Sequence, residues 1–119
     1  MPANTCIISN NSEQKAKLAQ CFERNALLST SFPRNLQNIF ELAQQSPLLL
    51  IVIALKQDPT LSKKICHSLK KNPLTKNTPL ILIKKQGLSE DQQLADAYLP
   101  DDFSMRDLEQ LVRQLTIGY

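Results

Sequence analysis

Short apolar runs alternate with amphipathic segments along the whole chain. The apolar runs occupy residues 6–9, 27–32, 48–55, 80–83 and 97–99. Each is followed by a segment whose apolar residues recur every three or four positions, at 12–25, 33–46, 60–72, 88–97 and 104–116. Short apolar runs are typical of buried strands, and a period of three to four is typical of helices. The pattern therefore predicts five strands and five helices in alternation.

The run LLLIVIAL at residues 48–55 is apolar at every position. A central strand of a parallel sheet has this pattern because helices cover both of its faces. Strands that alternate with helices over short connections form parallel sheets through right-handed crossovers. We therefore expect an α/β fold: one domain over residues 1–119, built as a three-layer αβα sandwich around a five-stranded parallel sheet. The more polar run at 27–32 suits an edge of that sheet.

Capping signals define the expected ends of the helices. Ser12, Ser89 and Ser104 are suited to cap three of them, and Ser104 stands three positions before Asp107 in a variant of the capping box. Pro33 opens the second helix, where a missing amide proton does no harm. The apolar positions expected to face the core are Leu18, Ala19, Phe22, Leu36, Ile39, Phe40, Ala43, Leu61, Ile65, Leu69, Leu108, Leu111, Val112 and Leu115.

The composition is that of an ordinary globular domain, with 119 residues of which 42% are hydrophobic and 21% charged. The longest apolar run is far shorter than the roughly 20 residues that cross a bilayer. The N-terminus also lacks the layout of a signal peptide. We therefore expect a cytoplasmic protein with no contact to a membrane. Cys6, Cys21 and Cys66 have no CxxC spacing, which favours reduced, partly buried thiols over a disulfide framework or a zinc site.

Charge is distributed unevenly around a net value of +3. Residues 56–85 carry eight lysines against one acid, Asp58, whereas residues 86–119 carry seven acids against Arg106 and Arg113. The chain is therefore strongly basic in one part and acidic in the next. Exposed charge of either sign is a candidate for binding a partner of the opposite sign.

Four stretches of the chain resemble one family. The segment LKKNPLTKNTPLILIKK (69–85) is similar to the run L-R-x-[DN]-P-x-T-[KR]-x-x-P-[IL]-[IL]-x-[LIV] of bacterial response-regulator receiver domains, the CheY-like family of two-component systems. In the same order, CIISNNSE, SPLLLIVI and LADAYLPDDF (94–103) resemble the family's V-V-D-D-D-P-E, P-D-L-I-L-L-D and G-A-D-D-Y-L-x-K-P-F. The resemblance spans essentially the whole chain. It implies a flavodoxin-like fold with strand order 2-1-3-4-5.

Receiver domains of this family take a phosphoryl group onto an aspartate at the end of the third strand. Two acids after the first strand hold Mg²⁺, a hydroxyl follows the fourth strand, and a lysine follows the fifth. The transferred group carries dispersed negative charge, so a metal ion and an ammonium must neutralise it, and Mg²⁺ prefers hard oxygen ligands.

None of these positions keeps the family's residue in this chain. Counting forward from Pro47 places Ile53 at the nucleophile position, and counting back from the helix at 60–72 places Ala54 there. Neither side chain accepts a phosphoryl group. The other departures are Ser9 and Asn10 at the acid pair, Lys84 at the hydroxyl position, Asp101 at the lysine position and Asp102 at the proline that follows it.

Two acids near these positions leave alternatives open. Asp58 lies four or five residues beyond the nucleophile position and has no acids near it in sequence, so we disfavour it as a replacement acceptor. Lys84 and Asp101 invert the family's charges. They either form an ion pair across the former site or are both solvated loop residues, and exposed pairs of this kind contribute at most about 1 kcal/mol.

We interpret the chain as a pseudo-receiver, a non-catalytic signalling, protein-interaction or dimerisation module of a bacterial regulatory protein. We expect no enzyme activity, no catalytic residue, no metal and no cofactor. In the family, the output face combines the fourth helix (88–97), the fifth strand (97–99) and the fifth helix (104–116). A protein partner or a second copy would bind there, and an output domain can follow in a longer protein. The residues expected on this face are Tyr98, Asp102, Arg106, Glu109 and Arg113.

Tyr98 matches the switch aromatic of the family's fifth strand. Its alternative role is structural: the ring packs against the helix at 104–116 and the hydroxyl faces water. The acids between Glu90 and Glu109 give the face a negative character, which favours a basic partner or a salt-sensitive dimer. Solvation of a helix surface is the alternative reading of the same charges.

Other functional classes find less support. The alternative is an atypical nucleic-acid-binding domain that uses the lysine-rich third helix, with Lys63, Lys64, Lys70 and Lys71 on its outer side. This cluster has no arginine and no interleaved aromatic residue, so we disfavour it. With only two glycines the chain has no phosphate-binding GxGxxG loop, which argues against a nucleotide or flavin enzyme. His67 lacks a matching nucleophile and is expected to be a surface residue of its helix.

Overall fold

The computed structural model describes residues 3–9, 11–24, 28–33, 35–45, 48–55, 59–84, 95–100 and 102–115. In chain order the elements are β1 (Ala3–Ser9), α1 (Ser12–Glu23), β2 (Leu28–Ser31), α2 (Leu36–Gln45), β3 (Leu48–Ala54), α3 (Pro59–Lys71), β4 (Leu80–Lys84), β5 (Ala97–Pro100) and α4 (Met105–Leu115). The helix expected at 88–97 falls mostly on residues 85–94, outside the described residues, and its expected last residue, Ala97, begins β5. The helix expected at 104–116 is α4.

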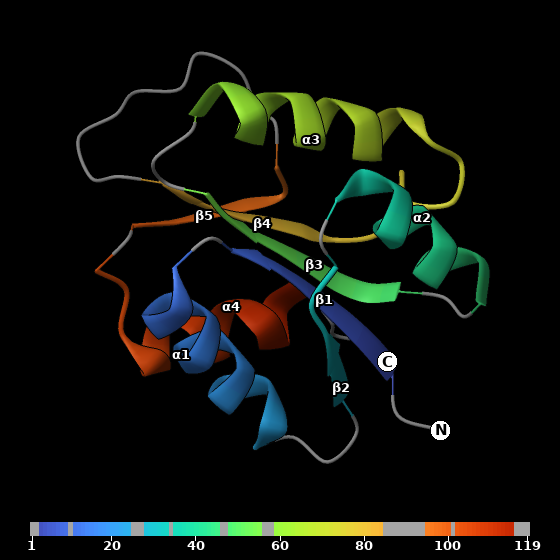
Figure 1. The fold of residues 1–119 in the computed structure, drawn as a ribbon. Helices are drawn as coiled ribbons and strands as arrows, with labels where there is room; N and C mark the ends of the chain where they lie inside the picture. Colours follow the sequence, from blue (N-terminus) through green and yellow to red (C-terminus); the bar gives the residue numbers. More distant parts are fainter. Residues whose placement is uncertain are drawn as a thin grey trace.

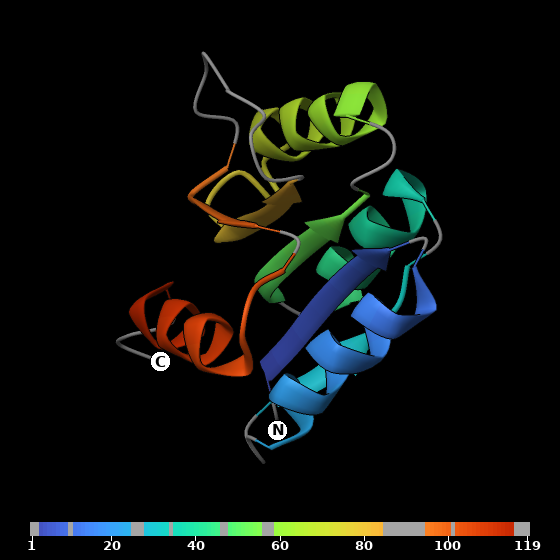
Figure 2. The same ribbon diagram turned by 90° about the vertical axis from the view of Figure 1, so that its left-hand side faces the viewer.

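The five strands form one parallel sheet in the order β2-β1-β3-β4-β5. Figure 1 shows α2 and α3 on one face of this sheet and α1 and α4 on the other, and Figure 2 shows the same three layers from the side. The αβα sandwich, the strand order and the edge position of β2 are confirmed. None of the described helices is long and apolar enough to cross a membrane.

All seven residues of β3 are buried, as its uninterrupted apolar sequence predicts. Successive side chains of a strand point to opposite faces of the sheet. Ile51 and Ile53 therefore belong to the apolar layer under α2 and α3, whereas Leu50, Val52 and Ala54 belong to the layer under α1 and α4. The protein thus has two cores that share a single sheet. β3 contributes to both of them along its whole length.

The first and last helices differ in how well their caps were predicted. The Oδ1 atom of Asn11 accepts a hydrogen bond from the Gln14 amide at 3.0 Å, so Asn11 caps α1 in place of the predicted Ser12. At α4 the predicted capping box is confirmed. The Oγ atom of Ser104 accepts from the Asp107 amide at 3.1 Å, and Asp107 Oδ2 accepts from the Ser104 amide at 3.4 Å.

The second helix begins later than predicted. Asn35 Oδ1 accepts a hydrogen bond from the Asn38 amide at 3.0 Å, which makes Asn35 the N-cap and Leu36 the first helical residue. Pro33 lies in the connection before the cap rather than in the first turn. The physical reason is that an asparagine side chain satisfies a free helix amide, which proline cannot do.

The segment that resembles the receiver family most closely forms the turn between α3 and β4. The Asn72 carbonyl accepts hydrogen bonds from the amides of Thr75 and Lys76 at 3.0 and 2.8 Å, and Asn72 Oδ1 accepts from the Leu74 amide at 2.9 Å. The buried Thr75 hydroxyl donates to the Leu69 carbonyl at 2.6 Å and so ends the helix. The N-P-x-T signature is therefore a structural device, independent of any chemistry at the sheet edge.

One predicted core residue is exposed. Leu61, in the first turn of α3, keeps 42% of its surface accessible, whereas Ile65 and Leu69 farther along the helix are buried. A regular apolar spacing shows which side of a helix faces the sheet, but not where the sheet ends beneath it. The prediction for Leu61 is therefore wrong, and its side chain instead lines a cavity described below.

The three cysteines are buried and form no disulfide. Burial raises the pKa of the Cys6 thiol to about 12. For Cys21 the pKa is also raised, first by burial and then by the Glu109 carboxylate, against the Arg24 guanidinium, which lowers it. A thiol that stays protonated is a poor nucleophile, so these side chains act as core packing.

Alkaline pH should destabilise the protein through Cys6. In the unfolded chain the thiol releases its proton near its ordinary pKa, whereas the folded protein retains that proton until about pH 12. The stabilisation is therefore complete below about pH 9 and is lost above it, at about 1.4 kcal/mol per pH unit from this one group. Urea unfolding of the wild type and Cys6→Ala should show a shallower alkaline decline for the variant. Identical slopes would contradict the assignment to Cys6.

Candidate functional site

The carboxyl ends of β1 and β3 lie side by side in the middle of the sheet. The register pairs Ile8 with Ile53 and Ser9 with Ala54. On the other side of β3, Ile53 pairs with Leu82 of β4. Ligands of open parallel sheets bind in the crevice outside the carboxyl ends of neighbouring strands. This edge is therefore the place to look for a site.

The end of β3 carries no reactive group. Ile53 and Ala54 are fully buried, on opposite faces of the sheet, and Leu55 after them is 7% exposed. Phosphoryl acceptance needs an oxygen, nitrogen or sulfur nucleophile with a free lone pair, and alkyl side chains have none. Both candidates for the nucleophile position, Ile53 and Ala54, are thus part of the core.

The end of β1 uses its polar residue to build a turn. The Ser9 hydroxyl donates a hydrogen bond to the Asn11 carbonyl and accepts one from the Asn11 amide, both at 3.1 Å. These contacts close the connection from β1 to the cap of α1. Asn10 lies outside the described residues. In the part of the chain that the structure describes, no group of three or more histidine, cysteine, aspartate or glutamate side chains gathers in one place.

The ends of β4 and β5 are also adjacent, since Lys84 pairs with Pro100 in the backbone register. The side chain of Lys84, and the whole of Asp101 and Asp58, lie outside what the structure describes. The ion pair between Lys84 and Asp101 therefore stays a prediction. The ends of β4 and β5 are adjacent, which such an ion pair would require.

A lysine approaches the connection after β5 from α1 instead. The Nζ atom of Lys17 lies 4.3 Å from the centroid of the Phe103 ring and donates a hydrogen bond to the Phe103 carbonyl. Phe103 is buried in the core under α1 and α4, and it occupies the phenylalanine position of the K-P-F resemblance. A cation over an aromatic face is attracted by the ring quadrupole. This contact ties α1 to the start of α4, and sequence reasoning did not find Lys17.

Comparison with solved structures places this geometry among known folds. The chemotaxis response regulator CheY4 of Vibrio cholerae aligns with a TM-score of 0.76 and 12% identity over 97% of this chain and 99% of its own. A signal receiver domain of a histidine kinase from Syntrophus aciditrophicus gives 0.76 and 20% over 98% and 91%. The receiver domain of the Francisella response regulator 1452 gives 0.74 and 21% over 96% of both chains.

The chain has the receiver-domain fold. Identities of this size establish the fold and leave the chemistry to be argued from the residues. No protein-family model matches the sequence, and no curated protein matches it either. The resemblance in the sequence and the likeness in structure agree on the fold, including the strand order that the resemblance implied.

Within this receiver fold, Tyr98 lies on the face opposite to the one that its structural alternative required. It packs against the core under α2 and α3, and its Oη atom accepts a hydrogen bond from the Ala95 amide at 3.3 Å. The alternation along β5 instead directs Leu99 toward α4. Packing of Tyr98 against the last helix, with its hydroxyl in water, is therefore wrong.

The charged residues predicted for the output face have different surroundings. Asp102, Arg106 and Arg113 are exposed. Glu109 instead forms an ion pair with Arg24 at the end of α1, with 3.2 Å between Oε1 and Nη1. Glu109 therefore joins the two helices that cover one face of the sheet. Its exposure of 38% still leaves part of the carboxylate open to water.

Asp96 makes contacts that sequence reasoning missed. Its Oδ2 atom lies 2.7 Å from Lys70 Nζ and accepts from the Leu80 amide at 2.8 Å, while the Asp96 amide donates to the Leu80 carbonyl at 2.9 Å. One carboxylate thus links α3, β4 and the start of β5. The sequence feature that could have pointed to Asp96 is its position in the resemblance, where it matches the first aspartate of G-A-D-D-Y. The pairing also removes Lys70 from the exposed lysines of α3, which keep Lys63, Lys64 and Lys71.

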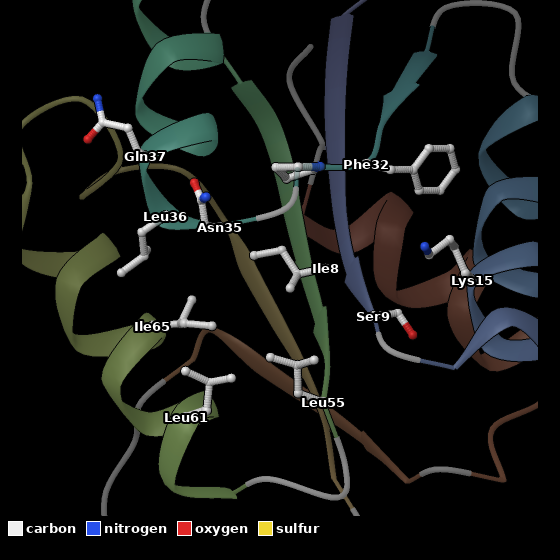
Figure 3. Close-up of a pocket in the computed structure, with 11 residues that line it drawn as sticks. Ile8, Ser9, Lys15, Phe32, Asn35, Leu36, Gln37, Leu55, Leu61 and Ile65 are labelled. Carbon is white, nitrogen blue, oxygen red and sulfur yellow. The ribbon is translucent and has the colours of Figure 1, made fainter.

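A cavity of about 770 Å³ opens beside the ends of β1 and β3. Figure 3 shows five aliphatic side chains facing a common space between the strands, α2 and α3. They are Ile8, Leu36, Leu55, Leu61 and Ile65. The cavity volume is in the range of small-molecule sites, which are mostly apolar with a few polar groups.

A carboxylate placed at the end of β3 should destabilise the protein. Ile53→Asp buries an unpaired charge in an apolar layer and should lower the free energy of unfolding by about 3–5 kcal/mol at neutral pH. Burial raises the pKa of the new carboxyl, so the loss should shrink as the pH falls toward 4. Leu74→Asp, at an exposed leucine, is the matched control and should cost less than about 1 kcal/mol. Urea unfolding that found Ile53→Asp as mild as its control would contradict this account.

Proposed function

We propose that this chain is a pseudo-receiver: a module with the receiver fold that acts in a regulatory protein through protein contacts, without phosphorylation. The observation that carries the proposal is the end of β3, where Ile53 and Ala54 are both fully buried. A receiver of the usual kind has its acceptor carboxylate there. An alkyl core in its place supports a scaffold that has kept the sheet and lost the reaction.

The surroundings of this position support the same conclusion. Phosphoryl transfer needs metal and cationic groups around the acceptor, because charge on the transferred group must be neutralised. Neutral hydroxyl and amide groups bind Mg²⁺ weakly without carboxylates beside them. Ser9, at the first position of the former acid pair, is engaged with the backbone of Asn11. No described residue at this edge offers a replacement for the acceptor.

Internal contacts favour a single arrangement of the side of the sheet that carries β5. Lys17 holds the connection into α4, and Asp96 links α3 to β4 and to the start of β5. Tyr98 is fixed by its contact with the Ala95 amide. A switch requires two arrangements of similar free energy, which a ligand or modification can bias. We infer that the module signals by its presence and its partners rather than by a phosphoryl-driven change of shape.

The partner surface in this proposal is the edge formed by β5 and α4. The described part of that edge exposes both signs of charge, with Arg106 and Arg113 on α4 and Asp102 just before it. A two-fold dimer buries the same patch on both copies, so a patch with both signs can be complementary to itself. This supports a salt-sensitive homodimer or a protein partner of mixed charge.

Acetyl phosphate with Mg²⁺ tests the first part of the proposal. The expected result is an unchanged intact mass, because no acceptor carboxylate lies at the end of β3. A receiver domain that accepts phosphate from acetyl phosphate serves as the positive control in the same buffer. A stable gain of about 80 Da, the mass of one phosphoryl group, would overturn the proposal, and peptide mapping of the adduct would then identify the acceptor.

Charge reversal on α4 tests the proposed surface. The double variant Arg106→Glu/Arg113→Glu should weaken self-association at low salt by at least roughly tenfold, since like charges would face each other across a two-fold interface. Lys63→Glu/Lys71→Glu changes the net charge equally on α3 and should leave association unchanged. Sedimentation or light scattering at low and high salt measures both variants. A wild type that stays monomeric in every condition would rule out the dimer, and equal losses in both variants would place the interface elsewhere.

A further inference from the structure

The cavity beside the ends of β1 and β3 has an apolar end of unusual exposure. Leu61, which lines the cavity among aliphatic side chains, is 42% exposed. Large apolar side chains left in water cost free energy that burial would recover, at about 25 cal/mol per Å² of area covered. Ile8, Leu55 and Ile65 face the same space as Leu61 and are buried (Figure 3). This end is therefore suited to cover an aliphatic group.

The other end of the cavity is cationic. Lys15 is the charged member of the described lining, and its Nζ atom lies 5.6 Å from the centroid of the Phe32 ring. Figure 3 shows Lys15 of α1 on the same side of β1 as Phe32, and the aliphatic group on the other side of that strand. Ser9 and Asn35 also line the cavity and add polar groups to it. The lining of the cavity thus combines an aliphatic group on one side of β1 with a positive charge on the other side.

We propose that this cavity binds a small amphipathic anion, a molecule with an aliphatic body and one negatively charged head such as a medium-chain carboxylate. The body lies against Leu55, Leu61 and Ile65, and the head lies near Lys15. The charge of the lining selects the sign of the ligand, because a described lining with a lysine and no acid favours an anion and disfavours a cation. The segregation of apolar and charged groups selects an amphiphile over a compact polar metabolite.

The size of the cavity favours a small molecule over a protein segment. A volume of about 770 Å³ is in the usual range for ligand sites of roughly 300–1,000 Å³. Protein interfaces need about 800 Å² from each partner, mostly on flatter surfaces. The inference rests on the cavity alone and not on the proposed function. A ligand site here is compatible with a module that is or is not phosphorylated.

Decanoate is the probe, used below the concentration at which it forms micelles. Calorimetric titration should show saturable binding of one decanoate per chain. Methyl resonances of Ile8, Leu55, Leu61 and Ile65 should shift with the same dissociation constant. Decanol, which keeps the body without the charge, should bind about fivefold more weakly, as expected for the loss of one partly exposed ion pair. Decyltrimethylammonium should bind more weakly still.

Two variants separate the ends of the cavity. Lys15→Gln should weaken decanoate binding about fivefold and leave decanol binding unchanged. Leu61→Ser should weaken both ligands about tenfold through the loss of apolar contact. The matched controls are Lys63→Gln, on the exposed side of α3, and Leu74→Ser, at a leucine that is also 42% exposed but lies away from the cavity. Both controls should bind like the wild type.

Several results would overturn the proposal. One is binding that never saturates, or that Leu74→Ser weakens as much as Leu61→Ser, because the amphiphile would then coat the surface. Another is decyltrimethylammonium binding as tightly as decanoate. A third is self-association that Leu61→Ser abolishes and decanoate leaves unchanged, since a second copy would then occupy the apolar end. Thermal unfolding of each variant without decanoate is measured first, so that a loss of binding is not confused with a loss of folding.

Discussion

Burial of β3 on both faces is the constraint on which this structure depends. A strand at the centre of a doubly covered sheet places every side chain in an apolar layer, and a charged group there must be paired or bound to metal. A receiver that phosphorylates meets this demand by surrounding its acceptor with a metal ion and a lysine. Without a metal ion beside it, a carboxylate at the end of β3 would be an unpaired buried charge, whereas the alkyl side chains Ile53 and Ala54 that stand there are fully buried. In the proposed pseudo-receiver, fold and chemistry are therefore coupled at this point, because an acceptor carboxylate without metal-holding acids would lower the stability of the sheet.

The features that the chain shares with receivers are those that build the fold. The N-P-x-T turn ends α3 through Asn72 and Thr75, and Asp96 links α3 to the last two strands. Neither contact involves the carboxyl edge of β1 or β3. The departures include every position that holds metal or phosphate in the family, from Ser9 and Asn10 to Lys84 and Asp101. The sequence can therefore resemble the family over its whole length while the nucleophile, acid-pair, hydroxyl and lysine positions all differ.

The architecture could be predicted from the sequence because each element carries a local signal. The apolar runs predicted the strands, the resemblance predicted their order, and Ser104 with Asp107 predicted the start of α4.

The predictions that failed depend on three-dimensional relations that residue spacing does not contain. Asn11 and Ser12 are adjacent residues of similar capping strength, so the sequence did not choose between them. Leu61 has the right spacing for the core but is 42% exposed and lines the cavity. Alternation along β5 did not reveal which face Tyr98 would take. The contacts of Lys17 and the cavity around Leu61 depend on how helices far apart in sequence are placed.

The most direct test of the central claim is a titration with Mg²⁺ and beryllofluoride, a non-covalent mimic of a phosphoryl group, followed through backbone amide resonances. If the former site has become part of the core, the amides of Ser9, Ala54 and Lys84 will show no saturable shift that requires both components together. Saturable shifts at the ends of β1, β3 and β4 that depend on Mg²⁺ and beryllofluoride together would contradict the account, because they would show that the edge of the sheet still assembles a phosphoryl site.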